Sequence, residues 1–317
     1  MGPYVARRLI QTLPLLFGVS LVIFGVIQAA PGGPEGALLA SGRSVDPQVV
    51  EAYRRRLGVD RPLPVQYLSW ARAAVRGDLG ASFSTARPVS AMIGERLPAT
   101  LELMVAAFSL AAMASLAVGV ASALRPHGAL DLFVTGSSFL GLAMPVFWLG
   151  LLLQLVFSIE LGWLPVSGTH TVGASSFGDH LLHLVLPALV LASRYVASWS
   201  RYLRASLLGV LESDYVRTAR AKGLKESRVI GVHALRNALL PVVSVMALGL
   251  ADLVSGAVIT ETVFAWPGIG RLFVQAMFAR DYPLLMGILL MGSVLVVLMN
   301  LAADVAYGVL DPRIRYA

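Results

Sequence analysis

Six long apolar runs constrain this chain more than any other feature of its sequence. A helix that crosses roughly 30 Å of hydrocarbon needs about 20 apolar residues, and each of these runs is that long. Only 14% of the 317 residues are charged, so little material is left for a large soluble domain. The sequence predicts an all-α polytopic membrane protein. Its six expected spans are residues 9–30, 101–124, 132–159, 181–200, 237–260 and 284–303.

Several residues interrupt these runs. Pro145 lies inside the third run, and the fourth run contains His183 and Arg194. The fifth run contains Asp252. The run 9–30 ends in Pro-Gly-Gly-Pro rather than in a small-residue cleavage site, which favours a retained first span over a cleaved signal peptide.

Basic residues in the short loops predict the orientation of the spans, because Lys and Arg gather on the cytoplasmic side. The interval between the fourth and fifth runs carries eight of them, and the interval between the third and fourth carries none. Both termini are therefore expected in the cytoplasm. The loop 31–98 carries nine Arg on the expected outer side, but it exceeds about 60 residues, where the charge rule loses force. The eight basic residues are Arg201, Arg204, Arg217, Arg220, Lys222, Lys225, Arg228 and Arg236.

Two short helices are predicted within this long outer loop. Asp46 followed by proline is typical of a helix start, which predicts a helix over 47–57 that ends at Gly58. A second amphipathic stretch, 64–75, ends before Gly77. We expect the two helices to form a small cap over the spans.

The residue types exclude several kinds of chemistry. The chain has no cysteine, so disulfides and thiolate ligands are absent. Its lysines, Lys222 and Lys225, precede Gly and Glu, so no nucleotide-binding P-loop can be built. His180 and His183 are expected to be solvated in an outer loop rather than to bind metal. The net charge of +7 is expected to mark cytoplasmic loops and not a nucleic-acid site. No catalytic or metal-binding residue is predicted.

Asp252 is the strongest candidate for a functional residue inside the spans, because an intramembrane carboxylate is costly. It either lines a solute pathway or bonds to a neighbouring helix. Ser255 is a second candidate for the pathway, although Ser255-Gly256 is also typical of close helix packing. An alternative function is a proton-coupled secondary transporter that uses Asp252, and an intramembrane serine protease is a more distant one.

The basic segment 214–236 differs from its apolar surroundings. It has the pattern of a helix, a glycine and a second helix, with Ala219 and Gly223 four residues apart. Small residues at this spacing allow another surface to approach the backbone closely. An ordinary charged loop needs neither this length nor this order, so the segment is interpreted as a helical docking device in the cytoplasm.

Five stretches carry a resemblance to a known family. In 214–241, Arg217-Thr218-Ala219, Gly223 and then 233–236 follow the loop pattern of binding-protein-dependent ABC importer permeases. The variant is that of the dipeptide/oligopeptide/nickel subfamily, in which the long loop after the first span resembles the first permease of the pair. The other four stretches are GDLGASF at 77–83, RLPATLEL at 96–103, ETVFAWPGIGRL at 261–272, and DPRIRY near the end.

This resemblance implies a division of labour among several subunits. A second permease would form the other half of the pathway for peptides, an extracytoplasmic protein would deliver them, and two cytoplasmic ATPases would bind ATP and Mg. No cofactor is expected on this chain, which would lie in the bacterial plasma membrane. Residues 1–97 would form a first span with its outer loop, and 98–317 the permease domain. The residues expected to couple to the ATPase are Asp214, Tyr215, Arg217, Thr218, Ala219, Ala221, Lys222, Gly223 and Leu224.

Overall fold

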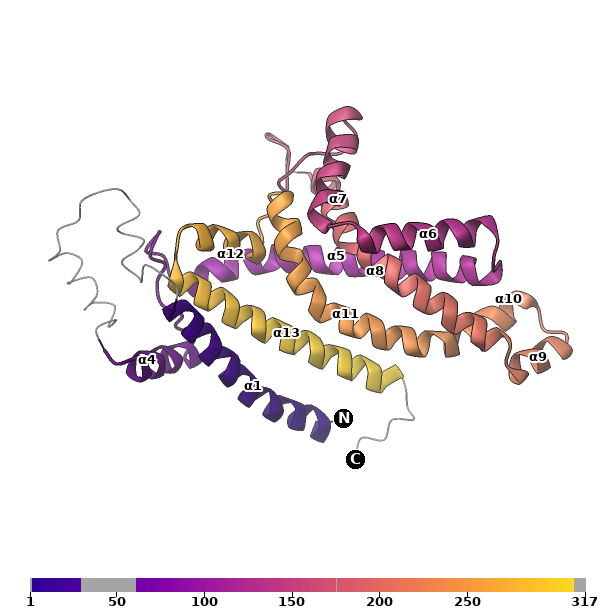
Figure 1. Cartoon of the computed structure of the whole chain (residues 1–317), viewed down its shortest axis with the longest axis horizontal. Coiled ribbons are helices and arrows are strands. Elements are labelled where there is room, and N and C mark those ends of the chain that lie inside the picture. The colour runs from indigo at the N-terminus through magenta and orange to yellow at the C-terminus, as the bar shows by residue number, and fades with distance from the viewer. Residues whose placement is uncertain (1, 30–60, 175, 311–317) are drawn as a thin grey trace. The chain divides into compact units, whose positions relative to one another are not determined.

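A computed structural model describes residues 2–29, 61–174 and 176–310. Within these residues every regular element is a helix, as the apolar runs predict (Figure 1). The elements are α1 (Gly2–Gln28), α4 (Leu63–Val75), α5 (Val89–Leu124), α6 (Ala129–Ala143), α7 (Val146–Leu153), the π-helix η1 (Gln154–Glu160), α8 (Phe177–Leu211), α9 (Asp214–Ala221), α10 (Glu226–Arg228), the π-helix η2 (Val229–Ala234), α11 (Leu235–Val263), α12 (Ile269–Phe278) and α13 (Tyr282–Leu310).

Five of the expected spans are helices long and apolar enough to cross a membrane, and the remaining one is bent. Ala129–Ala143 and Val146–Glu160 meet at an angle of 110°. Met144 and Pro145 both have extended backbone at the bend, with ψ of 130° and 133°. Proline disfavours helical backbone in the residue before it. The third expected run is therefore two helices that meet at a bend beside Pro145.

The helices also extend beyond the apolar runs. The second helix begins at Val89, twelve residues before the apolar run, so Glu102 lies well inside α5. The fourth extends over the 35 residues of α8 and begins at a capping residue, Ser176, whose hydroxyl accepts from the backbone N–H of Asp179. Charged helical turns carry no apolar signal, so hydropathy marks only the part of a helix that suits hydrocarbon.

The outer-loop helix expected over 64–75 is present as α4, and Gly77 follows it with a positive φ of 84°. Its partner, expected over 47–57, lies outside the described residues. The short helix α12 was not predicted, because its ten residues lie between two longer apolar runs.

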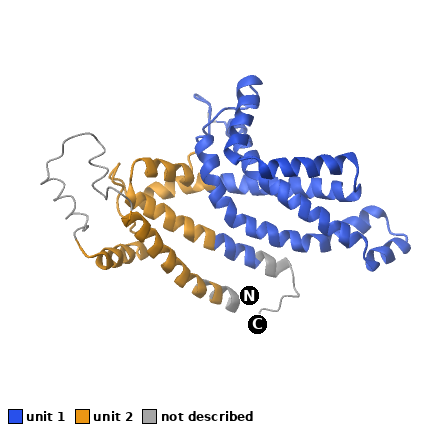
Figure 2. Ribbon diagram, viewed as in Figure 1, with its two compact units in different colours: residues 1–2, 101–266, 298–317 blue, residues 3–100, 267–297 orange. Residues whose placement is uncertain are grey.

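The chain divides into two compact units, which Figure 2 distinguishes by colour. One consists of residues 3–100 and 267–297. Its core gathers Val89 and Ile93 of α5, Leu272 of α12, and Leu284 and Ile288 of α13. A second cluster in the same unit packs Tyr67 of α4 against Phe24 of α1, with ring centroids 5.5 Å apart.

The other unit consists of residues 1–2, 101–266 and 298–317, and its central feature is the contact between α8 and α11. Gly249 of α11 permits this contact, because a Cβ atom there would lie 2.8 Å from the Trp199 ring. The helix α6 is held to α8 by an ion pair: buried Asp131 accepts from Arg204 Nε at 2.5 Å and Nη2 at 2.6 Å. Asp131 also accepts from the Ser122 hydroxyl of α5.

Candidate coupling segment and polar pathway

The basic segment forms two short helices beyond the ends of α8 and α11 (Figure 1). Val216 and Ala219 of α9 are buried in a cluster with Leu207 of α8, Val229 of η2 and Ala238 of α11. The charged helix α9 is therefore anchored by an apolar face on its own chain. Such a mount holds α9 against the ends of α8 and α11.

The turn between α9 and α10 is fixed by one glycine and one ion pair. Gly223 has a φ of 74°, which side chains with a Cβ adopt only with strain. Arg220 Nη2 lies 2.7 Å from Glu226 Oε1 across the turn, and its Nε lies 3.2 Å from both carboxylate oxygens. The helix–glycine–helix pattern predicted from the sequence is present.

From the turn, the chain continues into the membrane without a break. The helical stretch from α10 through η2 to the end of α11 covers 38 residues, Glu226–Val263. Tyr215 joins α9 to this stretch, since its hydroxyl accepts from Asn237 Nδ2 at 3.0 Å. A side-chain hydrogen bond thus links α9 to the first turn of α11.

The exposed side of α9 differs in part from the surface that the sequence predicts. Asp214, Arg217, Thr218 and Ala221 lie on the face opposite to the buried one and are exposed. Lys222 and Gly223 are also exposed, and Leu224 is half-buried. Ala219 is buried among the chain's own helices, so its small side chain serves packing within the chain. Periodicity alone did not show which side of this short helix is covered.

Asp252 has partners on the neighbouring helix α8. Its Oδ2 lies 3.5 Å from Arg194 Nη1 and accepts from the Tyr195 hydroxyl at 3.2 Å. The Arg194 and Asp252 side chains are still 59% and 46% exposed, so the pair is both a bond between helices and part of an open surface. Ser255 is exposed one turn further on, whereas a Cβ on Gly256 would lie 3.0 Å from Leu191.

Histidines and carboxylates contact one another near the start of α8, and the sequence predicts only the histidines of this cluster. His180 Nε2 lies 2.6 Å from Glu102 Oε1, and its ring lies near those of His170 and Trp266. The expectation that His183 is solvated is wrong. Its side chain is buried, with Nε2 3.3 Å from the Thr171 hydroxyl. The carboxylates come from distant parts of the sequence, so spacing could not reveal them. Among the described residues no group of three or more such side chains is arranged to hold a metal ion.

Candidate membrane spans, together with a basic segment that packs on the chain's own helices, fit the class of transporter permeases. The chain belongs to the family described as "Binding-protein-dependent transport system inner membrane component", whose model matches residues 115–316. The model of the N-terminal part of this membrane component matches residues 1–104. Chains of this family are membrane components, and separate ATPase subunits hydrolyse ATP, so this chain is not itself an enzyme.

Known relatives match over the full length. An oligopeptide transport system permease protein of Bacillus subtilis is 44% identical and covers 100% of both chains. A di/tripeptide transport system permease protein of Pseudomonas aeruginosa is 42% identical over 100% of this chain and 99% of its own. A glutathione transport system permease protein of Pectobacterium atrosepticum is 42% identical over 99% of both. These relatives confirm the peptide-type ABC permease resemblance.

A solved structure supports the fold. The crystal structure of an amino acid ABC transporter with histidines superposes with a TM-score of 0.51 at 13% identity, covering 71% of this chain and 95% of that chain. At this identity the likeness concerns the fold alone.

Proposed function

We propose that this chain is one of two permease subunits of a peptide importer. A second, related permease forms the other half of the pathway, and an extracytoplasmic binding protein delivers the peptide. Two ATPase subunits, which bind ATP and Mg, dock on the cytoplasmic side. Both termini lie in the cytoplasm, residues 1–97 form the first span with the outer loop, and residues 98–317 form the permease domain.

The observation that carries this proposal is the mounting of α9. Its apolar face packs on the chain's own helices, while Asp214, Arg217, Thr218 and Ala221 face outward. A loop that only joins two spans has no need of a buried anchor, a closed turn and a brace to α11. A docking helix needs all three, because force applied to it must reach the spans.

The proton-coupled alternative has less support. Asp252 is paired with Arg194 and bonded to Tyr195, so it is not the isolated carboxylate that a proton relay on this residue alone would use. Membership of a binding-protein-dependent family supports ATP as the energy source.

The docking role is tested by Ala221→Trp in the complete transporter. Ala221 is exposed and helical, so a bulky side chain there leaves this chain's fold intact and separates α9 from an ATPase groove. We expect ATPase association and peptide uptake in proteoliposomes to fall together by about tenfold or more, because about 1.4 kcal/mol of docking free energy is a factor of ten.

Ser227→Trp is the matched control, since Ser227 is exposed in the same segment but on α10. It should assemble and transport like the unchanged protein. Normal uptake by Ala221→Trp, or equal losses in both variants, would contradict docking through the exposed face of α9.

A further inference from the structure

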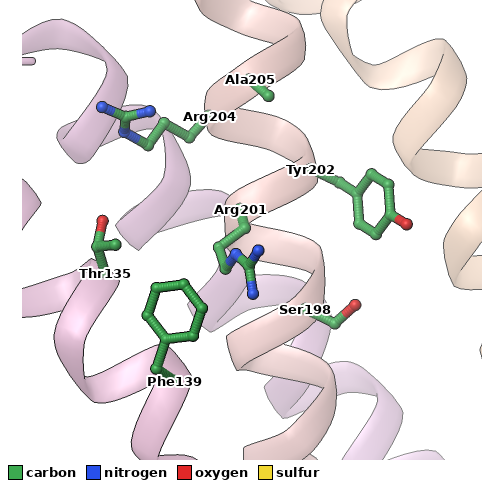
Figure 3. Close-up of a pocket in the computed structure, with 7 residues that line it drawn as sticks. All are labelled: Thr135, Phe139, Ser198, Arg201, Tyr202, Arg204 and Ala205. Atoms are coloured by element: carbon green, nitrogen blue, oxygen red, sulfur yellow. The ribbon is translucent and has the colours of Figure 1, made fainter. Parts of the chain in front are cut away.

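A cavity of about 540 Å³ opens between α6 and α8, close to the end of α8 that leads into α9. Figure 3 shows its side chains, with Arg201 directed towards the Phe139 ring. The lining residues are Thr135 and Phe139 of α6, and Ser198, Arg201, Tyr202, Arg204 and Ala205 of α8.

The two arginines of this cavity are in different electrostatic states. Arg204 is neutralised by Asp131. Arg201 is exposed, and within the described part of the chain no carboxylate lies within ion-pair distance of it. Its guanidinium carbon lies 4.7 Å from the centroid of the Phe139 ring, which holds the cation in place. The cavity thus presents one unneutralised guanidinium, and Thr135, Ser198 and Tyr202 add hydroxyl groups to its lining.

The position of Arg201 on α8 indicates what the cavity faces. Arg194, Ser198, Arg201 and Ala205 follow one another at spacings of four, three and four residues, so they form one stripe along the helix. Arg194, at one end of this stripe, forms the half-exposed pair with Asp252. A charged pair this deep in a span faces protein or a water-filled space rather than lipid. The stripe as a whole therefore faces the interior of the assembled transporter.

We propose that Arg201 is a binding residue for the carboxylate terminus of the peptide as it passes through the pathway. This inference rests on the proposed function and adds a place of contact within it. A guanidinium binds a carboxylate through two parallel hydrogen bonds, a geometry that few other groups match. Arg201 lies seven residues beyond Arg194, about 10 Å along the helix, so its site follows the Arg194–Asp252 pair on the way towards α9.

The absence of cysteine allows a direct test with one introduced thiol. Ser198→Cys places it in the cavity, and labelling of this chain is followed in the complete transporter. The probes are an anionic sulfonatoethyl and a cationic trimethylammonium-ethyl methanethiosulfonate. We expect the anionic reagent to be favoured by about tenfold, because a fixed cation in a cavity concentrates anions. Added trialanine should slow labelling, and trialanine amide, which lacks the carboxylate, should not.

Three second-site variants complete the test. Arg201→Gln should remove both the anionic preference and the protection by trialanine, whereas Arg201→Lys should keep part of each. Arg125→Gln lowers the net charge equally at an exposed site outside the cavity and should change neither. The labelling rate reports on the cavity itself, so the result does not depend on which peptides the binding protein accepts.

Several results would overturn the assignment. A thiol at position 198 that neither aqueous reagent reaches would place the cavity against lipid. Reaction without protection by trialanine would exclude the peptide terminus. The same labelling is compared in vesicles of anionic phosphatidylglycerol and of phosphatidylcholine. If the preference for the anionic reagent is lost only in phosphatidylglycerol, as it should be in Arg201→Gln, then Arg201 binds a lipid phosphate instead. Stimulation of ATP hydrolysis by the binding protein tests the proposed function separately, so a transporter that passes that measurement and fails these would refute only the role of Arg201.

Discussion

The Asp281 side chain joins the turn at 82–84 to the start of α13. It is fully buried just before α13 and accepts from the Ser82 hydroxyl at 2.5 Å, from the backbone N–H of Phe83 at 3.0 Å, and from the Ser84 hydroxyl at 2.8 Å. Burial alone would raise the pKa of Asp281, but these donors outweigh it and hold the pKa below the ordinary aspartate value. The ionised form is therefore the one that the fold requires.

Replacement of Asp281 by Asn is expected to destabilise the turn at 82–84, because an amide cannot accept from all these donors and each buried donor left unpaired costs about 1–3 kcal/mol. The pKa of Asp281 is depressed on folding, so its contribution is present above the unfolded value and lost as pH falls through the folded one. Thermal unfolding of the purified transporter should thus lose stability below about pH 4 in the unchanged protein.

In Asp281→Asn, this loss of stability at low pH should not occur. Asp78→Asn removes an exposed carboxylate in the same loop and serves as the control. Identical pH dependence in the Asp281 variant and the unchanged protein would refute the role given to its ionised form.

Among the helices, the sequence predicts those features that are encoded within one continuous stretch of residues. Apolar length predicts the existence of the spans, and glycine with flanking charges predicts the shape of the segment around Gly223. The sequence does not predict the 110° bend between α6 and α7. Proline is tolerated in membrane helices, so Pro145 alone does not show whether the helix breaks there. Nor does the sequence predict the contacts of Asp252, His180 or Asp281, because their partners lie on distant parts of the chain.

The start of α12 depends on one such distant contact. Its first backbone donor, the N–H of Ile269, binds the Thr100 hydroxyl of α5 at 2.8 Å, and the preceding residue, Gly268, provides no side-chain cap. Thr100→Val keeps the shape but leaves this buried donor unpaired. We expect a loss of about 1–3 kcal/mol in stability, read as a lower midpoint in thermal unfolding.

Thr100→Ser keeps the hydroxyl and should restore most of that stability. A serine variant no more stable than the valine variant would show that the methyl group, and not the hydrogen bond, matters at this position.

The molecule as a whole presents apolar side chains outward on several helices. Ile10 and Leu13 of α1, Phe133 of α6 and Leu298 of α13 are all exposed. Such a surface is stable only in hydrocarbon or against another apolar protein. The polar residues that remain exposed inside the spans, such as Arg194, are the parts of the surface that lipid does not suit.

The direction of insertion is testable without background labelling, because the chain contains no cysteine. Lys225→Cys should react with an impermeant maleimide only from the cytoplasmic side, and His170→Cys only from outside. Both positions are exposed on this chain, so in the absence of the ATPase subunits the membrane limits access to them. Labelling of the two from the same side would overturn the predicted topology.

The continuous helix from α10 to α11 has two places where regular helical bonding is lost, η2 and Pro241. Both are known sites of bending, and both precede Asp252. Asp252 lies eleven residues beyond Pro241, about 16 Å along the helix, so a tilt of roughly 10° at the proline displaces Asp252 by about 3 Å. That displacement is close to the length of a salt bridge. If α9 moves, as the proposed docking role requires, a small change of angle at η2 or Pro241 is enough to make or break the Arg194–Asp252 contact.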